Sequence, residues 1–421
     1  MQKLLIKGKK KLSGTISISG SKNASLPILA STILTSKKVF LKNVPMLKDV
    51  ETMLSLLKSL GSKISINKKK NEVIILNNKK LKTTASYNLL KTMRAGVLVL
   101  GPLLAKFYKA KVSLPGGCAI GSRPVDIHLN ALKKMGAIIE IKDGYIFAKA
   151  PKGLKGAKIV FPKISVGATE NILIAACFAK GKTIMKNCAC EPEIKDLSNF
   201  LIKSGCKIRW TGKRSIEIFG INELQSTVYK IIFDRIEAGT YSIAAALTGG
   251  NIIIKNISPK IIKTELNILK KMGVKIKKSV NQIQIIDNSN LKKINLTTSP
   301  YSGFPTDLQA QMMVLMCKSK GTSTIKENIF ENRFMHVSEL KRIGADIKIE
   351  GNKATIYGGA SFNGAELMAT DLRASVSLVL AGLVASKTTI INRIYHLDRG
   401  YEKLESKLSK CGASIKRLKN G

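Results

Sequence analysis

The hydrophobic and polar positions of this chain repeat one phrase six times: an amphipathic stretch, a glycine, then a short run with alternating apolar residues. A glycine directly after an amphipathic run is typical of a helix end, and a two-residue apolar period is typical of a half-buried strand. Each phrase therefore predicts a helix followed by a strand. The six segments are Leu56–Ile64, Leu132–Ile139, Leu201–Ile208, Leu269–Ile276, Leu340–Ile347 and Leu408–Ile415.

The glycines of these phrases are 75, 69, 68, 71 and 68 residues apart, so the repeating unit has close to 70 residues. Most units carry a strand before the helix, as at 183–187, 252–256, 324–328 and 388–392. A second strand follows, as at 73–76, 145–148, 216–219, 283–286 and 354–357. This last strand is missing after the sixth phrase. The N-terminal run Leu4–Gly8 is predicted to replace it, which brings both termini into one domain.

Six units of this length favour an α/β fold with two similar domains of three repeats, each with helices packed inside short sheets. A 70-residue unit is too long for a solenoid repeat. The predicted domains are residues 22–231, and residues 1–21 together with 232–421.

The composition indicates a soluble globular chain of 421 residues with 44% hydrophobic residues. Its apolar runs are shorter than the roughly 18 residues that span a bilayer, and no secretory signal is visible, so no membrane insertion is predicted. Seven cysteines and three histidines show neither a disulfide framework nor metal-ligand spacing. We therefore expect a cytoplasmic protein without metal or cofactor, whose oligomeric state the sequence leaves open.

The formal net charge of +44 raises the alternative of a nucleic-acid partner. The excess is nearly all lysine, scattered along the chain, and aromatic residues make up only 5% without interleaving with it. Stacking platforms for bases are therefore absent, and nucleic-acid binding is disfavoured. Against this background the eleven arginines stand out, because arginine offers a planar fork for carboxylate or phosphate.

Residues 114–126 (LPGGCAIGSRPVD) combine three glycines, two prolines, the thiol of Cys118 and the guanidinium of Arg123. Such a segment predicts a mobile loop, and a cation near the thiol favours the reactive thiolate. The alternative is that Cys118 is a small residue filling a turn.

Several motifs, taken together, resemble those of the UDP-N-acetylglucosamine enolpyruvyl transferase family, which is similar to EPSP synthases. They are Gly20–Asn23, residues 114–126, Ser165–Thr169, Phe304–Asp307, Phe330–His336, Asp371–Arg373 and Arg393–Tyr401. The resemblance implies two inside-out α/β barrel domains, each of three βαβαββ units. It also implies transfer of the enolpyruvyl group of phosphoenolpyruvate to the 3-hydroxyl of UDP-N-acetylglucosamine, with release of phosphate. That reaction is the first committed step of peptidoglycan synthesis, which serves cell-wall biogenesis, cell shape and cell division.

The resemblance also implies residue roles. Cys118 protonates the methylene carbon and is the target of the epoxide antibiotic fosfomycin, and Asp307 takes the sugar hydroxyl proton. Lys22 and Arg399 complete the expected catalytic set. The expected substrate-binding residues are Lys22, Asn23, Arg94, Arg123, Pro124, Val125, Asp126, Ile127, Lys163, Ile164, Ser165, Val166, Asp307, Ile329, Arg333, Asp371, Arg373 and Arg399.

The residues by themselves leave plainer alternatives open. Lys22 can belong to a capped surface helix over 26–34, and Asp307 can be the N-cap of a helix over 308–315. Arg94 lies in an apolar stretch, 89–104, that predicts one helix. Arg333, Asp371, Arg373 and Arg399 can be surface salt-bridge formers. The nearest rival activity is enolpyruvyl transfer to shikimate 3-phosphate.

Overall fold

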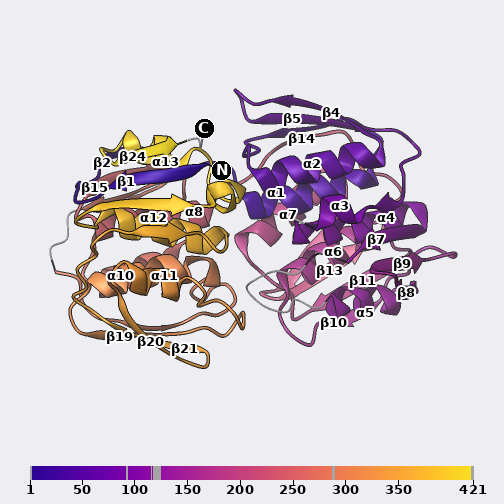
Figure 1. Ribbon diagram of the computed structural model, residues 1–421. Helices are drawn as coiled ribbons and strands as arrows, with labels where there is room; N and C mark the ends of the chain where they lie inside the picture. Colours follow the sequence, from indigo (N-terminus) through magenta and orange to yellow (C-terminus); the bar gives the residue numbers. More distant parts are fainter. Residues whose placement is uncertain (1, 92, 115, 117–124, 287–289, 419–421) are drawn as a thin grey trace. The chain divides into compact units, whose positions relative to one another are not determined.

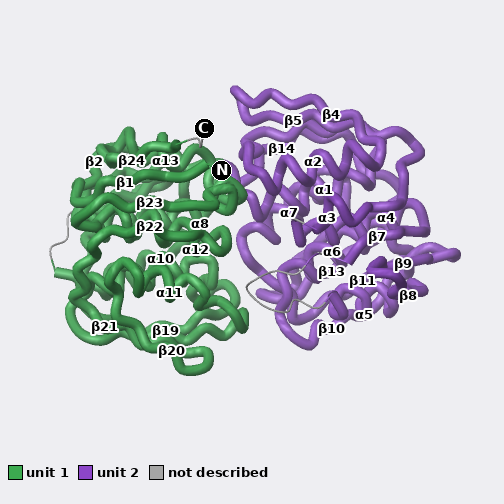
Figure 2. The backbone as a smooth tube through the Cα atoms, viewed as in Figure 1, with its two compact units in different colours: residues 1–19, 119–122, 233–421 green, residues 20–118, 123–232 purple. Residues whose placement is uncertain are grey.

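The structure, a computed structural model, describes residues 2–91, 93–114, 116, 125–286 and 290–418. Its described residues form two compact units, shown in Figure 2. Unit 1 holds residues up to 19 and from 233 onward, and unit 2 holds the described residues from 20 to 116 and 125 to 232. The chain thus changes unit at 19/20 and 232/233, where the sequence suggested 21/22 and 231/232. Ser21 belongs to unit 2 because its amide bonds the carbonyl of Ile232, at 2.8 Å.

Each unit holds three four-stranded sheets with one common strand pattern (Figure 1). One sheet is representative: β10 (Lys158–Val160) runs parallel to β11 (Lys182–Lys186), and β13 (Ser215–Phe219) pairs antiparallel with both β11 and β12 (Lys207–Gly212). Its chain order is strand, helix, strand, helix, strand, strand. The predicted α/β fold of two domains with βαβαββ repeats is confirmed.

The elements of unit 2 fall into three repeats. The first contains β14 (Thr227–Lys230), α1 (Lys22–Ser31), η1 (Thr32–Leu34), β3 (Val39–Lys42), α2 (Lys48–Leu60), β4 (Ser62–Asn67) and β5 (Glu72–Asn77). The second contains β6 (Thr84–Ala85), α3 (Tyr87–Leu90), η2 (Arg94–Val99), α4 (Leu100–Phe107), β7 (Lys109–Ser113), α5 (Asp126–Lys134), β8 (Ile138–Lys142) and β9 (Tyr145–Lys149). The third contains β10 (Lys158–Val160), α6 (Val166–Ala176), β11 (Lys182–Lys186), α7 (Pro192–Lys203), β12 (Lys207–Gly212) and β13 (Ser215–Phe219).

Unit 1 has the same organisation. Its first repeat contains β2 (Ser13–Ser17), α8 (Arg235–Leu247), β15 (Asn251–Lys255), α9 (Lys263–Lys271), β16 (Lys275–Ser279) and β17 (Gln282–Ile286). The second contains β18 (Asn295–Thr297), η3 (Thr306–Leu308), α10 (Gln309–Lys318), β19 (Thr322–Lys326), α11 (Val337–Arg342), β20 (Asp346–Glu350) and β21 (Lys353–Tyr357). The third contains β22 (Glu366–Met368), α12 (Leu372–Leu383), β23 (Thr388–Asn392), η4 (Ile394–Arg399), α13 (Leu404–Ser409), β24 (Ser414–Leu418) and β1 (Lys3–Lys7).

The N-terminal strand completes the last repeat. β1 lies between β23 and β24 and pairs antiparallel with both, with Leu4 opposite Ile391 and Arg417. The predicted replacement strand is therefore confirmed, and both termini belong to unit 1. Both changes of unit occur at the same point of a repeat. The chain crosses after the first strand of a repeat, β2 or β14, and before the first helix of a repeat, α1 or α8.

All six predicted helix-ending glycines adopt the left-handed conformation. Gly61, Gly136, Gly205, Gly273, Gly344 and Gly412 have φ of 112°, 92°, 101°, 94°, 113° and 93°. An L-residue rarely adopts such a φ, which explains why the phrase needs glycine at this point.

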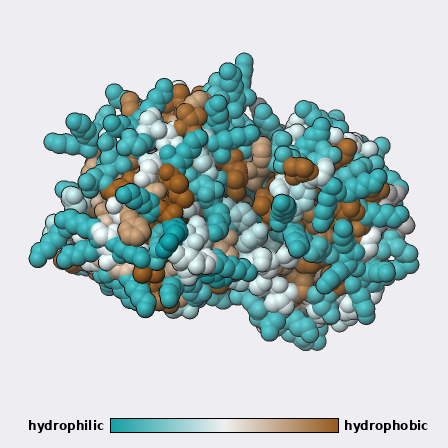
Figure 3. All heavy atoms as spheres, turned by 180° about the vertical axis from the view of Figure 1, so that it is seen from behind, coloured by the Kyte–Doolittle hydropathy of each residue, from teal (hydrophilic) through white to brown (hydrophobic). Residues whose placement is uncertain are grey.

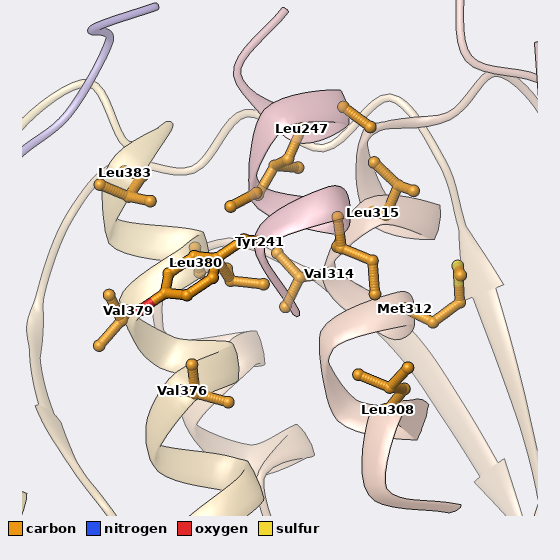
Figure 4. Close-up of a cluster of buried hydrophobic side chains, with 14 of the residues drawn as sticks. Tyr241, Leu247, Leu308, Met312, Val314, Leu315, Val376, Val379, Leu380 and Leu383 are labelled. Carbon is orange, nitrogen blue, oxygen red and sulfur yellow. The ribbon is translucent and has the colours of Figure 1, made fainter. Parts of the chain in front are cut away.

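One helix of each repeat, called the inner helix below, contributes to the core of its unit: α1, α4 and α6 in unit 2, and α8, α10 and α12 in unit 1. Every residue of α8 and α12 is buried, as are nearly all residues of α10. Figure 4 shows Tyr241 and Leu247 of α8 packed with Met312, Val314 and Leu315 of α10 and with Val379, Leu380 and Leu383 of α12. Helices that are buried on all sides have to be enclosed by other elements, and the sheets enclose these.

The predicted single helix over 89–104 is wrong: the structure has α3, the 3-10 helix η2 and α4 instead. At the junction of η2 and α4 the helix is interrupted by Asn171 of α6. Its side-chain amide donates to Val97 O at 3.1 Å, and its carbonyl accepts from Gly101 N at 2.7 Å. Asn171 thereby replaces the backbone bond that would join residues 97 and 101 of a continuous α-helix. A Cβ at Gly101 would lie 2.2 Å from Asn171 Oδ1, so only glycine fits there.

Among the described residues, no helix is long and apolar enough to cross a membrane. The face shown in Figure 3 carries hydrophilic side chains over much of its area, with hydrophobic ones dispersed between them. The described cysteines, at 177, 188, 190, 206, 317 and 411, are buried free thiols.

Candidate active site

The N-terminal ends of α10 and α12 meet at Asp307 in unit 1. Its Oδ1 accepts a hydrogen bond from Arg333 Nη2 at 3.0 Å, and its Oδ2 accepts one from Arg373 Nη2 at 2.9 Å. The two arginine side chains are only 4% and 7% exposed, whereas that of Asp307 is 27% exposed. The carboxylate is therefore the member of this triad that solvent, and hence a substrate, can reach.

The plainer alternatives for these residues do not hold. Leu308, not Asp307, is the residue directly before α10, and Asp307 itself lies inside η3. Arg333 and Arg373 are buried rather than surface salt-bridge formers. Burial opposes the charge of Arg373, yet the carboxylates of Asp307 and Asp234 raise its pKa. Asp234, one of these carboxylates, is the N-cap of α8 and accepts from the amides of Ile236 and Glu237.

Glu327 fixes the loop that carries Ile329. Its buried carboxylate accepts from the hydroxyls of Thr298 and Thr306, each at 2.9 Å, and from the amides of Ile329 at 2.8 Å and Phe330 at 3.2 Å. Thr306 directly precedes Asp307, so one carboxylate links the Ile329 loop to the turn of Asp307. The sequence reasoning missed Glu327; its only signal was an acidic residue within the predicted strand 324–328, near its end.

Asp371 and two histidines lie beside the triad. Asp371 caps α12, accepting from the amides of Arg373 at 2.7 Å and Ala374 at 3.1 Å. Burial, followed by the charge of Arg333, lowers the pKa of His336 to about 4, although Asp371 acts in the opposite direction. His396 has a pKa lowered by burial and then by Arg399, again opposed by Asp371. Arg399 is the last residue of η4, the element that also contains this histidine.

In unit 2 the N-terminus of α1 presents Lys22 and Asn23. Ser21 caps this helix by accepting from Ala24 N at 3.3 Å, and Lys22 Nζ donates to Asp49 Oδ2 at 3.1 Å. Both Lys22 and Asn23 are partly exposed. The helix is capped, as in the alternative that the sequence left open, but its residues 24–31 are buried, so it is not a surface helix. Lys22 lies at its N-terminal end, which favours anions.

A second group of candidate residues in unit 2 surrounds His128. Burial and then the charge of Arg94 lower the pKa of His128 to about 4, against a raising effect of Asp126. His128 Nδ1 lies 3.1 Å from Asn171 Nδ2, and a Cβ at Gly167 would lie 3.3 Å from the ring. The group therefore joins Arg94 of η2, the start of α5 and the first turn of α6.

The remaining candidates of unit 2 lie in the connections to these helices. Val125 precedes α5, which Asp126 and Ile127 open. Lys163 is exposed and Ile164 partly so, between β10 and α6. Ser165 caps α6, accepting from Ala168 N at 3.3 Å, and Val166 is the first residue of α6. Cys118, Arg123 and Pro124 lie outside the described residues.

Comparison with known proteins identifies the family. The family model described as EPSP synthase (3-phosphoshikimate 1-carboxyvinyltransferase) matches residues 6–408. The chain belongs to this family. Curated relatives over nearly the whole chain are named UDP-N-acetylglucosamine 1-carboxyvinyltransferase. That of Pelagibacter ubique is 65% identical over 99% of this chain and 100% of its own length, and that of Endomicrobium trichonymphae is 52% identical over 100% of both.

Solved structures agree on the fold of this EPSP synthase family member. The enolpyruvyl transferase NikO from Streptomyces tendae matches with a TM-score of 0.88 at 22% identity, covering 100% of this chain and 99% of its own. An EPSP synthase from Acinetobacter baumannii matches with a TM-score of 0.77 at 20% identity over the whole of both chains.

Several candidate residues of this family member lie at the N-terminal ends of inner helices: Lys22 and Asn23 at α1, Ser165 and Val166 at α6, Asp307 before α10, and Asp371 and Arg373 at α12. The C-terminal ends of the inner helices of unit 1 line a different pocket, of about 330 Å³. Its lining residues are Lys9, Lys10, Lys11, Leu247, Thr248, Lys318, Leu383 and Val384. Lysines at helix C-termini complement the negative end of the helix dipole, so this basic pocket has a structural explanation. Among the described residues, no group of His, Cys, Asp and Glu is arranged to hold a metal ion.

Proposed function

We propose that this protein transfers the enolpyruvyl group of phosphoenolpyruvate to the 3-hydroxyl of UDP-N-acetylglucosamine and releases phosphate, the first committed step of peptidoglycan synthesis. The observation that carries the proposal is full-length identity of 52–65% to curated proteins named for this activity. The arrangement around Asp307 supports it, because a partly exposed carboxylate held by two buried cations is suited to proton transfer beside anionic substrates.

The reaction is an addition followed by an elimination. In the addition, the methylene carbon of phosphoenolpyruvate gains a proton. The oxygen of the sugar 3-hydroxyl attacks the adjacent carbon, and the hydroxyl loses its proton. A proton then leaves the new methyl group and the phosphate departs with its bonding electrons. We assign Cys118 to the protonation of the methylene carbon and Asp307 to the proton of the sugar hydroxyl.

Anion recognition is assigned to the basic residues. Phosphoenolpyruvate is proposed to be bound by Lys22, Asn23, Arg123 and Arg399. The anion site is proposed to be completed by Arg333, Asp371 and Arg373. The nucleotide sugar is proposed to contact Arg94, 123–127, 163–166, Asp307 and Ile329. Helix N-termini support this assignment, since their free amides and positive dipole ends favour phosphate and carboxylate groups. We propose units 1 and 2 as the two domains of the enzyme and the cytoplasm as its location.

The acceptor is the point on which the family is divided. The family model carries a description naming 3-phosphoshikimate, whereas the full-length relatives are named for UDP-N-acetylglucosamine. Phosphate release from phosphoenolpyruvate, measured with each acceptor in turn, decides between them. We expect release with UDP-N-acetylglucosamine and none with shikimate 3-phosphate. Release with shikimate 3-phosphate, or without any acceptor, would contradict the proposal.

Cys118 is expected to react with fosfomycin in the presence of UDP-N-acetylglucosamine. The thiolate sulfur attacks an epoxide carbon, a C–S bond forms, and the C–O bond opens to an alkoxide that takes up a proton. The protein supplies internal controls, because the other cysteines are buried and burial raises the pKa of the Cys188 and Cys317 thiols to about 12. Mass spectrometry should find one adduct, on Cys118, and none in Cys118→Asp. Adducts on the buried thiols, or an unmodified wild-type protein, would count against the assignment.

A further inference from the structure

A chain of hydrogen bonds runs from Arg373 into the core of unit 1. Arg373 Nη1 donates to the hydroxyl of Tyr401 at 3.2 Å, and this hydroxyl lies 2.9 Å from Thr240 Oγ1. Thr240 Oγ1 in turn donates to Ile236 O of α8 at 2.9 Å. The chain starts on the same guanidinium whose Nη2 holds Asp307.

The proton positions in this chain follow from its two ends. Arginine only donates, and the Thr240 proton is used on the Ile236 carbonyl. The Tyr401 hydroxyl must therefore accept from Arg373 and donate to Thr240. Every donor then has an acceptor, and the chain has one direction from Arg373 to the α8 backbone. A hydroxyl that both accepts and donates is needed at residue 401.

Gln311 connects the same chain to the backbone of Asp307. Its Nε2 donates to Asp307 O at 2.9 Å and lies 3.2 Å from both Tyr401 Oη and Thr240 Oγ1. The side chain and the main chain of Asp307 are thus attached to one buried network. Thr240 and Gln311 are fully buried and Tyr401 is 2% exposed, so water does not replace these bonds.

We propose that Tyr401 is a positioning residue for the enolpyruvyl transfer, fixing the guanidinium of Arg373 so that it holds the Asp307 carboxylate in its reactive orientation. This inference rests on the proposed function. Tyr401 does not touch the reacting atoms; it acts through Arg373. The Arg373 guanidinium lies 5.5 Å from the Tyr401 ring centre as well, so ring and hydroxyl orient it together.

The experiment replaces Tyr401 by phenylalanine, which keeps the buried ring and removes the hydroxyl. In this variant Nη1 of Arg373 has lost its acceptor, so the guanidinium is no longer held in place. Its Nη2 is then displaced from Asp307. We expect kcat to fall roughly 10- to 100-fold, the loss typical of a misplaced catalytic group. The KM for UDP-N-acetylglucosamine should change less than about threefold, because most of its proposed contacts do not involve Arg373, whereas the KM for phosphoenolpyruvate should rise, because Arg373 is assigned to its anion site. The acidic limb of the kcat profile should move to higher pH, because a displaced Arg373 stabilises the ionised carboxylate less.

Tyr241→Phe is the matched control. Tyr241 is an equally buried tyrosine of the same core, but it lies beside Glu237 and Lys407 rather than Asp307. Its kcat and pH profile should stay within about twofold of wild type. Thr240→Val is the second variant; it removes the acceptor of the Tyr401 hydroxyl and should shift kcat and the acidic limb in the same direction as Tyr401→Phe, by a smaller amount.

The outcomes separate the two proposals. If the wild-type protein releases no phosphate with UDP-N-acetylglucosamine, the proposed function fails. If the wild type is active and both Tyr401→Phe and Thr240→Val keep its kcat and acidic limb, the positioning role is overturned. A fall in activity that follows only the folded fraction, with an unchanged pH profile, overturns it too, because a purely structural role predicts that result.

Discussion

Replacing Asp307 by asparagine is expected to lower kcat by roughly 10³-fold, within the range that general acid–base catalysis contributes. Asparagine has nearly the same shape as aspartate but cannot take a proton from the sugar hydroxyl at neutral pH. It also places an NH₂ group against a guanidinium, because Arg333 and Arg373 each donate to a different oxygen of this carboxylate. Whichever way the amide turns, one arginine loses its acceptor.

Steady-state phosphate release by the purified variant checks this result. Glu217→Gln is the matched control, because Glu217 also accepts from two cations, Lys182 at 2.9 Å and Arg209 at 2.8 Å, on a sheet of unit 2. We expect this control to keep kcat within about twofold, since a surface ion pair contributes little. Asp307→Asn retaining more than a tenth of the wild-type kcat would remove Asp307 from the role of proton acceptor.

The repeat was predictable from the sequence because its signals are local. A glycine at φ near +100° after an amphipathic helix is a single-residue requirement, and it recurs at Gly61, Gly205 and Gly344 among others. The N-terminal strand could be placed because the last repeat lacks one strand and the chain offers a spare one at Lys3–Lys7.

The error at 89–104 arose because a tertiary contact decides the backbone there. Asn171, some 70 residues along the chain, supplies the hydrogen bonds that a continuous helix would make itself. The 3.6-residue periodicity of apolar positions does not indicate where a side chain from another helix is inserted between backbone groups. Gly101 was the one local sign, since its missing Cβ makes room for the Asn171 carbonyl.

The candidate site could be predicted as a set of residues but not as an arrangement. The motifs contain Asp307, Arg333 and Arg373, yet their joining depends on elements 26 to 66 residues apart in the chain. Tyr401 is the last residue of the motif Arg393–Tyr401, and nothing in the sequence indicates that its hydroxyl bonds Arg373. Gln311 does have a signal: it is a polar residue directly before the apolar run 312–317 of a buried helix, and a buried side-chain amide is usually hydrogen-bonded.

Gly20 opens the first of those motifs, and the structure explains why glycine is needed. A Cβ at this position would lie 1.8 Å from the backbone oxygen of Asn43 and 2.9 Å from its carbonyl carbon. Asn43 has little freedom to move, because its side chain donates to Ile231 O at 2.8 Å. The next residue, Ser21, caps α1 and thereby sets the position of Lys22.

Gly20→Ala is therefore expected to lower the free energy of unfolding of the protein by about 3 kcal/mol, the upper part of the usual range for overpacking. The displacement of Ser21 should also raise the KM for phosphoenolpyruvate, since Lys22 moves with the cap. Urea denaturation and steady-state kinetics measure the two effects. Gly212→Ala is the control: a Cβ there meets nothing closer than 3.8 Å, so stability and kinetics should match the wild type. Equal stability of the two variants would show that the Asn43 backbone yields, and that the glycine of this motif serves no packing purpose.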